Sequence, residues 1–434
     1  MDKMADVLGR AGAWCGQNKY LSAIKNAFQN FMPLTIAGAI GVLWCNVLVN
    51  DQTGLGLFFK PIMALDFLNP AFQAVNFCTI SCITVGITLG IAQEIGVWNM
   101  GAEKAGYIPG LVGLAAWLSV TNTSHMVEGA KEAFTGIAGN ELGATGLFTG
   151  MIIGVLSVEL FCFFEKQDAL KIKMPEQVPP GVARAFEVLV PATITLIITA
   201  CIGSACYNLT GLYLNDVIKN GIQGPLGAVG ATIPGVMIIY LVIMLFWLVG
   251  IHGNNMLSAV KEALFTPLAL ENVEKFNKGE KPTNIINMYF LQMCGEFGGS
   301  GVTIGLVIAI MIFGKREDNK AIASLSLIPG LFNINETVTF GIPMVLNPIL
   351  GIPFVFACLV TILVGYVLTV IGFCPVACLT VPWTTPPIVF GFLACCANVM
   401  GAVTQAILIV VSTVIYVPFL ISYEKYQNKQ AAEA

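Results

Sequence analysis

A carboxylate and two carboxamides stand close together in an apolar part of this chain. Asn333, Asn335 and Glu336 lie within four residues of one another, directly after the apolar stretch Leu331-Phe332. An unpaired charge in apolar surroundings costs several kcal/mol, so a carboxylate there needs partners. We therefore treat Glu336 as a candidate functional residue, with Asn333 and Asn335 as its polar neighbours.

The composition shows what surrounds these residues. Hydrophobic residues make up 56% of the chain and charged residues only 11%, which is far from the usual composition of soluble domains. An apolar run needs about 20 residues to cross a bilayer, and its backbone groups must pair within the segment, so each span is a helix. The sequence predicts an all-α polytopic membrane protein.

Apolar runs long enough to be considered as spans recur along the whole chain. We place them near 28–49, 71–95, 106–120, 143–164, 186–208, 231–251, 288–313, 341–373 and 389–421. Further apolar pieces near 321–332 and 375–388 are too short or too interrupted to cross.

A second polar group follows the apolar run 237–251. Gly250 and Gly253 lie close to His252 on its two sides and let the backbone leave helical geometry at low steric cost, and Asn254 and Asn255 add two carboxamides. Such a group is suited to hydrogen bonding with a polar ligand. The alternative is a helix-capping turn at the membrane edge.

Lysine and arginine predict the orientation, because cytoplasmic loops carry an excess of them. Basic residues gather near the N-terminus and again after the fourth predicted span, as Lys3, Arg10, Lys19 and Lys25, and as Lys166, Lys171, Lys173 and Arg184. Four crossings separate the two groups, so both are expected to be cytoplasmic. Lys425 and Lys429 place the C-terminus on the same side if the number of crossings is even.

The run 288–313 is harder to place, because basic residues stand on both sides of it. Either one basic loop faces outside, or the run dips into the membrane and returns. Its glycine-rich interior, from Gly295 through Glu296 to Gly301, favours the second option, since such backbone belongs where it is buried in protein or lines a wet cavity.

A charged, proline-bearing stretch at 165–185 divides the chain. We expect residues 1–185 to form an N-terminal scaffold or dimerisation bundle that ends in this cytoplasmic linker. Residues 186–434 are then a transport domain with broken helices, because most polar candidates fall there. The simpler alternative is that 165–185 is only a loop.

Several classes of partner are disfavoured. A net charge of −4 argues against nucleic acid, and no cleavable signal peptide is visible in the first 27 residues. The 13 cysteines are scattered through apolar runs, among them Cys78, Cys201, Cys395 and Cys396, and we interpret them as small buried hydrophobes. Neither a CxxC motif nor a Cys/His cluster occurs, so we expect no metal.

A sugar site suits the polar side chains better than an ion pore does. Sugar hydroxyls donate and accept together, and an aromatic ring fits the apolar face of a pyranose. The candidate substrate-binding residues are His252, Asn254, Asn255, Glu296, Asn333, Asn335, Glu336 and Trp383. Trp383 lies in a proline-bearing stretch and is the candidate platform, although an interfacial anchor is an alternative. Glu296 has the alternative of capping a local turn.

These motifs resemble the membrane-spanning C component (enzyme IIC) of bacterial phosphoenolpyruvate-dependent sugar phosphotransferase systems, in the lactose/cellobiose/diacetylchitobiose family. The resemblance extends from about Lys19 to Tyr423 and is carried by three stretches and a late piece, in this order: Gly250-Ile251-His252-Gly253-Asn254-Asn255, Gly295 to Gly301, Pro329 to Glu336, and Trp383-Thr384-Thr385-Pro386.

The resemblance implies about ten transmembrane helices with two re-entrant hairpins in two bundles. It also implies a homodimer formed through the N-terminal half, a sugar site in the C-terminal half, and a multi-pass location in the bacterial plasma membrane. Both termini are then cytoplasmic. No cofactor is implied.

The chemistry that the resemblance implies is phosphoryl transfer to the C6 hydroxyl of a disaccharide, with diacetylchitobiose or cellobiose as the expected substrate. A phosphocysteine on a B component (IIB), itself supplied by an A component (IIA) upstream, is the donor. Glu336 would accept the hydroxyl proton and His252 would orient the hydroxyl or stabilise the incoming charge. No B-type or A-type domain follows Tyr423, so we expect these partners to be separate polypeptides.

An ion-coupled secondary sugar transporter is the main alternative. In that case Glu336 or Glu296 binds a proton or sodium and no phosphoryl donor takes part, since buried acids and broken helices fit both kinds of carrier. A purely structural membrane scaffold would leave the polar residues unexplained.

Overall fold

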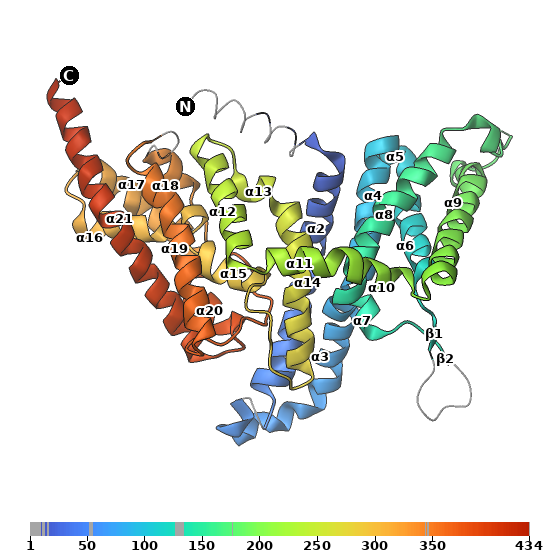
Figure 1. The fold of residues 1–434 in the computed structure, drawn as a ribbon, viewed down its shortest axis with the longest axis horizontal. Helices are drawn as coiled ribbons and strands as arrows, with labels where there is room; N and C mark the ends of the chain where they lie inside the picture. The colour runs from blue at the N-terminus through green and yellow to red at the C-terminus, as the bar shows by residue number, and fades with distance from the viewer. Residues whose placement is uncertain are drawn as a thin grey trace. The chain divides into compact units, whose positions relative to one another are not determined.

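The computed structural model describes residues 10, 14, 17–51, 55–125, 134–175, 177–342, 344 and 347–433, so Lys3 of the predicted basic cluster lies outside them. Within these ranges the chain is almost entirely helical (Figure 1), which confirms the predicted all-α class. The strands in the described ranges are one short antiparallel pair, β1 (Ser124–His125) and β2 (Phe134–Thr135).

The helices form two compact units. One includes Gln17–Gly38 and Ala74–Leu226, and the other includes Ala39–Gln73 and Gly227–Ala434. All candidate site residues named above belong to the second unit. The functional division into a dimerisation part, 1–185, and a transport part, 186–434, stays a prediction.

The elements up to residue 230 include several short turns between long helices. They are α2 (Lys19–Leu43), η1 (Trp44–Leu48), η2 (Leu55–Leu57), η3 (Lys60–Leu68), α3 (Asn69–Asn76), η4 (Phe77–Ser81), α4 (Ile83–Met100), α5 (Ala102–Ala105), α6 (Ile108–Val120), α7 (Gly139–Leu142), α8 (Ala144–Glu165), η5 (Asp168–Leu170), α9 (Pro180–Thr210), α10 (Leu214–Ile218), η6 (Lys219–Gln223) and α11 (Gly224–Gly230).

The elements after residue 230 are more often broken. They are α12 (Ile233–Leu248), α13 (Gly253–Met256), α14 (Ser258–Asn277), α15 (Met288–Gly295), η7 (Ser300–Val302), α16 (Ile304–Phe313), α17 (Glu317–Leu331), α18 (Glu336–Gly341), α19 (Gly351–Val370), α20 (Val389–Ala394) and α21 (Val399–Glu433).

In the first unit α4, α6 and α8 pack side by side (Figure 1). Gly113 of α6 permits this closeness, because a Cβ atom there would lie 2.3 Å from the Cβ of Ala92 in α4. Trp117 fills the space beside Ile153 with no exposed surface. This unit is a regular apolar bundle whose packing depends on small residues between helices.

Each predicted span has a helical counterpart. Five helical stretches are long and apolar enough to cross a membrane: Lys19–Leu48, Ala144–Glu165, Pro180–Thr210, Gly351–Val370 and Val399–Glu433. Two further pairs are bent, Lys60–Ser81 with Ile83–Met100 by 42° and Met288–Val302 with Ile304–Phe313 by 59°, and α6 and α12 are shorter apolar helices. The second bend confirms that the run 288–313 is interrupted where the glycines stand.

Two predicted boundaries were wrong. The run 341–373 begins as a helix only at Gly351, after Asn347 accepts hydrogen bonds from the backbone N–H groups of Ile349 and Leu350. The run 389–421 is two helices, α20 and α21. The backbone turns between them because Cys396 and Ala397 have φ values of 58° and 56°, which an α-helix of L-residues cannot contain.

The long helix α21 lies beside α16, α19 and α20 (Figure 1) and satisfies backbone groups that the breaks leave free. Gln405 accepts from the N–H groups of Ile388 and Gly391, and Tyr416 donates to the carbonyl oxygen of Gly301 at 2.8 Å. Both side chains are buried. Broken backbone is therefore paired inside the protein, as an apolar environment requires.

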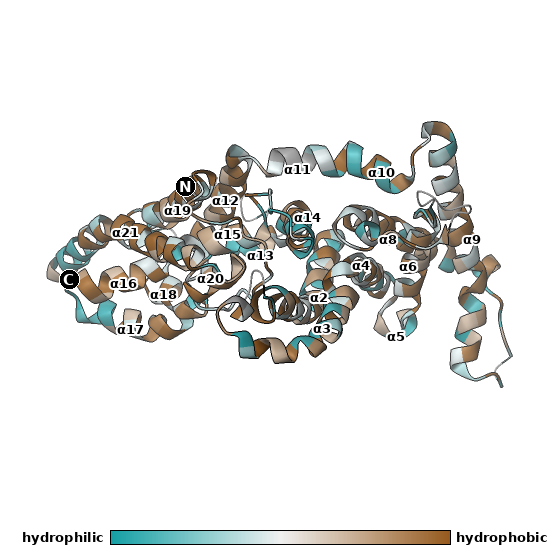
Figure 2. Ribbon diagram, turned by 90° about the horizontal axis from the view of Figure 1, so that it is seen from below, coloured by the Kyte–Doolittle hydropathy of each residue, from teal (hydrophilic) through white to brown (hydrophobic). Residues whose placement is uncertain are grey.

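Hydrophobic residues cover most of the helices, whereas hydrophilic residues gather at the C-terminal end of α21 and the start of α17 (Figure 2). There the buried carboxylate of Glu424 accepts from the backbone N–H groups of Lys315 and Arg316 at 2.9 and 3.2 Å. The turn into α17 is thus fixed to α21.

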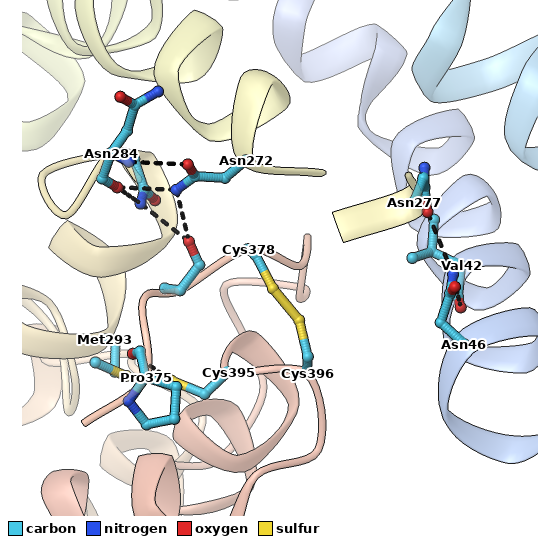
Figure 3. The surroundings of a disulfide bond; sticks show 12 residues. Val42, Asn46, Asn272, Asn277, Asn284, Met293, Pro375, Cys378, Cys395 and Cys396 are labelled. Carbon is cyan, nitrogen blue, oxygen red and sulfur yellow. Dashed lines mark hydrogen bonds between the residues drawn. A yellow bond between two sulfur atoms is a disulfide. The ribbon is translucent and has the colours of Figure 1, made fainter. Parts of the chain in front are cut away.

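The cysteines differ from the prediction. Cys395 is buried as expected, but Cys78 and Cys201 are exposed, because apolar spans present small side chains at their outer faces as well as inside. Cys396 forms a disulfide with Cys378 (Figure 3).

Candidate functional site

His252 and Glu336 face each other at the ends of two helical segments, and we call them the open pair. His252 precedes α13, and its Nδ1 accepts a hydrogen bond from the backbone N–H of Asn255 at 3.2 Å. The proton of the neutral ring therefore resides on Nε2, which lies 3.8 Å from Oε1 of Glu336. The side chains are 37% and 46% exposed, so a ligand hydroxyl can reach both.

The end of α12 holds the histidine in place. The ring of Trp247, which is buried, lies 4.5 Å from the His252 ring, centroid to centroid. Gly253, which follows His252, packs closely against the backbone of α12, since a Cβ atom there would lie 2.0 Å from the carbonyl oxygen of Ile243. The glycine beside the histidine is thus needed for close approach.

A second set of polar groups, which we call the buried polar cluster, consists of Tyr240, Asn254, Lys261, Glu296 and Ser300. Oε1 of Glu296 accepts from the Tyr240 hydroxyl at 2.7 Å and is ion-paired with Nζ of Lys261. Lys261 also donates to Oδ1 of Asn254 at 3.1 Å, and Asn254 donates to Oγ of Ser300 at 2.9 Å. The side chains of Lys261 and Glu296 are only 8% and 19% exposed.

The turn between α17 and α18 is fixed by its own carboxamides. Asn333, with φ at 63°, accepts from the N–H of Gly298 at 2.6 Å and donates to the carbonyl oxygen of Thr385 at 3.1 Å. Asn335 donates to the carbonyl oxygen of Ser300 at 2.9 Å. These carboxamides bind backbone groups, and their predicted role in sugar binding stays a prediction.

A glycine in the break between α15 and α16 makes room for the turn between α17 and α18. Gly299 has φ at 87°, and a Cβ atom there would lie 2.6 Å from the side chain of Asn335. Only a residue without a Cβ meets both conditions at low cost.

Trp383 lies in the irregular segment 371–388, and its side chain is 45% exposed. The segment is tied down before the tryptophan: the carbonyl oxygen of Ala377 accepts from the carboxamides of Asn272 and Asn287 at 3.1 and 3.0 Å, and the disulfide connects Cys378 to Cys396 (Figure 3). After it, the carboxamide of Asn333 binds the backbone. The indole is thus presented on a fixed loop.

The structure brings the predicted residues together in three groups. His252 meets Glu336, Asn254 meets Glu296 through Lys261, and Asn333 meets the backbone at Trp383. Asn255 is exposed, and its backbone N–H donates a hydrogen bond to Nδ1 of His252.

Sequence reasoning missed four residues, Tyr240, Trp247, Lys261 and Ser300. A signal existed for Lys261, because a lysine that soon follows the histidine motif, in a mostly apolar part of the chain, is costly unless it has a partner. No comparable signal existed for Tyr240 or Trp247, which look like ordinary members of an apolar helix. In the described ranges no group of three or more His, Cys, Asp or Glu side chains is arranged to hold a metal.

Long apolar helices, breaks in those helices, and polar side chains gathered at the breaks are the architecture of a membrane transporter. The class of protein is therefore a multi-pass membrane carrier with a polar site in its second unit.

The family follows from comparison with known proteins. The model of the phosphotransferase system EIIC family matches residues 25–358, and the chain belongs to this family. It is a sugar permease subunit of a phosphotransferase system.

Relatives and a solved structure agree along the full length. The oligo-beta-mannoside-specific EIIC component of Bacillus subtilis (strain 168) is 33% identical over 98% of this chain and 94% of the relative. The cellobiose-specific EIIC component of Lactococcus lactis subsp. lactis (strain IL1403) is 28% identical over 98% of both chains. The crystal structure of the transporter ChbC, the IIC component from an N,N'-diacetylchitobiose-specific phosphotransferase system, superposes with a TM-score of 0.88 at 29% identity over 97% of both chains.

Proposed function

We propose that this permease subunit imports a β-linked disaccharide, diacetylchitobiose or cellobiose, and presents its C6 hydroxyl to a phosphorylated IIB protein. The sugars named for the similar proteins, cellobiose and N,N'-diacetylchitobiose, support this substrate class. The observation that carries the proposal is the open pair, in which an N–H donor and a carboxylate oxygen face each other across 3.8 Å.

The open pair fits a hydroxyl that must lose its proton during transfer. Oε1 of Glu336 accepts the proton of the sugar hydroxyl as the oxygen attacks phosphorus, while the bond between phosphorus and the donor cysteine sulfur breaks. The Nε2–H of His252 donates to the same hydroxyl oxygen or to a phosphoryl oxygen. Trp383 stacks on a pyranose ring, and Asn255 adds a hydrogen bond.

The proposed setting has further parts. The IIB donor is a separate protein that receives its phosphoryl group from IIA. The subunit forms a homodimer through its N-terminal half in the lipid bilayer, with both termini in the cytoplasm. The positive residues around Lys19 and Arg184 support this orientation.

The deciding experiment uses purified protein in liposomes with labelled diacetylchitobiose or cellobiose outside. Phosphorylated IIB is placed inside one batch and omitted from a second. We expect sugar phosphate to accumulate inside only with the donor. Free sugar concentrated by an imposed proton or sodium gradient, without any need for a donor, would instead establish an ion-coupled carrier.

A further inference from the structure

Lys261 is buried to an extent that is rare for a lysine without a partner. Its ammonium group contacts Glu296 and Asn254, and it lies 5.6 Å from the centroid of the Tyr240 ring. These three residues come from α12, α13 and the break after α15. One cation on α14 therefore connects α12, α13 and the break after α15.

The neighbouring carboxylate of Glu262 has a hydrogen bond of its own. Oε2 of Glu262 accepts from the hydroxyl of Thr266, one helical turn further along α14. Lys261 and Glu296 thus form a locally neutral pair, and each charge has a hydrogen-bonding neighbour besides its counter-charge. A buried pair is tolerated only under that condition.

In ion-coupled carriers with broken helices, a cation lies beside a carboxylate and freed backbone groups near the substrate. Here a covalently attached ammonium group occupies the position beside Glu296. We propose that Lys261 is a built-in counter-ion and positioning residue that holds Glu296 and Asn254 in the sugar-binding arrangement, so that sugar binding needs no inorganic cation. This inference rests on the proposed function in that the sugar site lies at these residues.

Lys261 does not contact the open pair and is connected to it only indirectly, through Asn254, Ser300 and Asn335. Asn254 lies two positions after His252, and Ser300, which Asn254 binds, accepts at its carbonyl oxygen from Asn335, the neighbour of Glu336. Loss of Lys261 should therefore disturb sugar affinity more than the rate of phosphoryl transfer from the bound sugar.

The test measures binding of labelled diacetylchitobiose and cellobiose to the purified full-length protein, in sodium and in choline buffers of equal ionic strength. The variants are Lys261→Met, Lys261→Arg, Glu296→Gln and the double variant Lys261→Met/Glu296→Gln. Lys278→Met is the matched control, because Lys278 lies exposed at the end of the same helix α14. Gel filtration and thermal unfolding verify folding.

We expect the same affinity of the unaltered protein in both buffers. Lys261→Met should bind sugar at least about tenfold more weakly, because it leaves a buried carboxylate unpaired. The double variant should bind sugar better than Lys261→Met, since the second change removes the unpaired charge, and Lys261→Arg should retain binding. Phosphorylation per bound sugar should change little in the variants that still bind.

Three results would overturn the inference. They are sodium-dependent binding by the unaltered protein, unchanged sugar affinity in Lys261→Met, or a double variant whose loss of sugar affinity equals that of Lys261→Met or is the sum of the two single losses. Failure of the proposed function looks different, because binding is measured without a donor. If the unaltered protein binds neither sugar, the proposed substrates are wrong. Thermal unfolding of the same variants in the two buffers then decides the role of Lys261, since stabilisation of the unaltered protein by sodium alone would refute it.

Discussion

The two carboxylates that lie in the motifs of the second unit, Glu296 and Glu336, have opposite surroundings. Glu296 belongs to the buried polar cluster, where it is ion-paired with a lysine and accepts a hydrogen bond from a tyrosine hydroxyl. Glu336 belongs to the open pair, where its neighbour is a histidine nitrogen 3.8 Å away and nearly half of its side chain is exposed. Two fixed donors hold Oε1 of Glu296, whereas the nearest polar neighbour of Glu336 is a histidine nitrogen beyond hydrogen-bonding distance.

These surroundings distinguish a structural acid from a reactive one. A carboxylate that is paired with a fixed cation keeps its negative charge more readily, so it is a poorer acceptor for a substrate proton. A half-exposed carboxylate beside an N–H donor is able to accept a proton from a ligand between them. The comparison predicts that changes to the two regions will affect different measurements.

The largest effect is expected from Glu336→Gln. An amide cannot accept the hydroxyl proton, so phosphorylation of bound sugar should fall by roughly 100-fold or more, while sugar binding changes little. Donor-dependent phosphorylation and direct binding are measured on the same preparation. Glu317→Gln is the control, since that side chain is exposed on the same unit. If Glu336→Gln instead lost its activity through weaker sugar binding and phosphorylated each bound sugar at the normal rate, the distinction between the two acids would be removed.

Trp383→Ala should chiefly weaken binding. Loss of stacking on a sugar ring is expected to reduce affinity about tenfold, with phosphorylation of the bound sugar close to normal. Trp98→Ala is a matched control, because Trp98 is also exposed but lies on α4 of the other unit. An equal effect of both changes on sugar affinity would argue that Trp383 is an interfacial anchor.

Tyr240→Phe tests the buried polar cluster without changing charge. Glu296 keeps Lys261 but loses the tyrosine hydroxyl, so the free energy of unfolding should fall by about 1 kcal/mol, and turnover of bound sugar should not change. Thermal unfolding measures this, with Tyr207→Phe, at an exposed position of α9, as control. A variant with normal stability but slow phosphoryl transfer would place the cluster in the chemistry.

The smallest effect is expected at Asn255, which is next to Asn254 of the buried polar cluster but is not part of that cluster. Asn255→Ala should lower sugar affinity only about fivefold, the effect of one neutral hydrogen bond, and leave the unfolding temperature unchanged, because its side chain is exposed. Asn254→Ala should lower the unfolding temperature as well, since it leaves Lys261 and Ser300 short of a partner. If both variants lose the same stability, the boundary between the two regions is misplaced.

Much of the fold was predictable. Long apolar runs in a chain with few charges indicated helices in a membrane, and the glycines from Gly295 to Gly301 correctly indicated a broken helix. The break at Cys396 and Ala397 was not predictable, because neither residue type favours a left-handed backbone. The disulfide between Cys378 and Cys396 was also missed. Its formation depends on how the loop after α19 returns to the start of α21, which the sequence does not specify.

The class of protein, the approximate positions of the spans and most of the polar candidates could be predicted from the amino-acid sequence. These depend on local properties, namely hydrophobicity over about 20 residues and the cost of a polar group among apolar ones. Which acid is paired and which is open depends on tertiary contacts. Lys261 meets Glu296 across 35 positions and His252 faces Glu336 from another helix, because such contacts depend on which helix faces come together, and spacing in the sequence does not specify that.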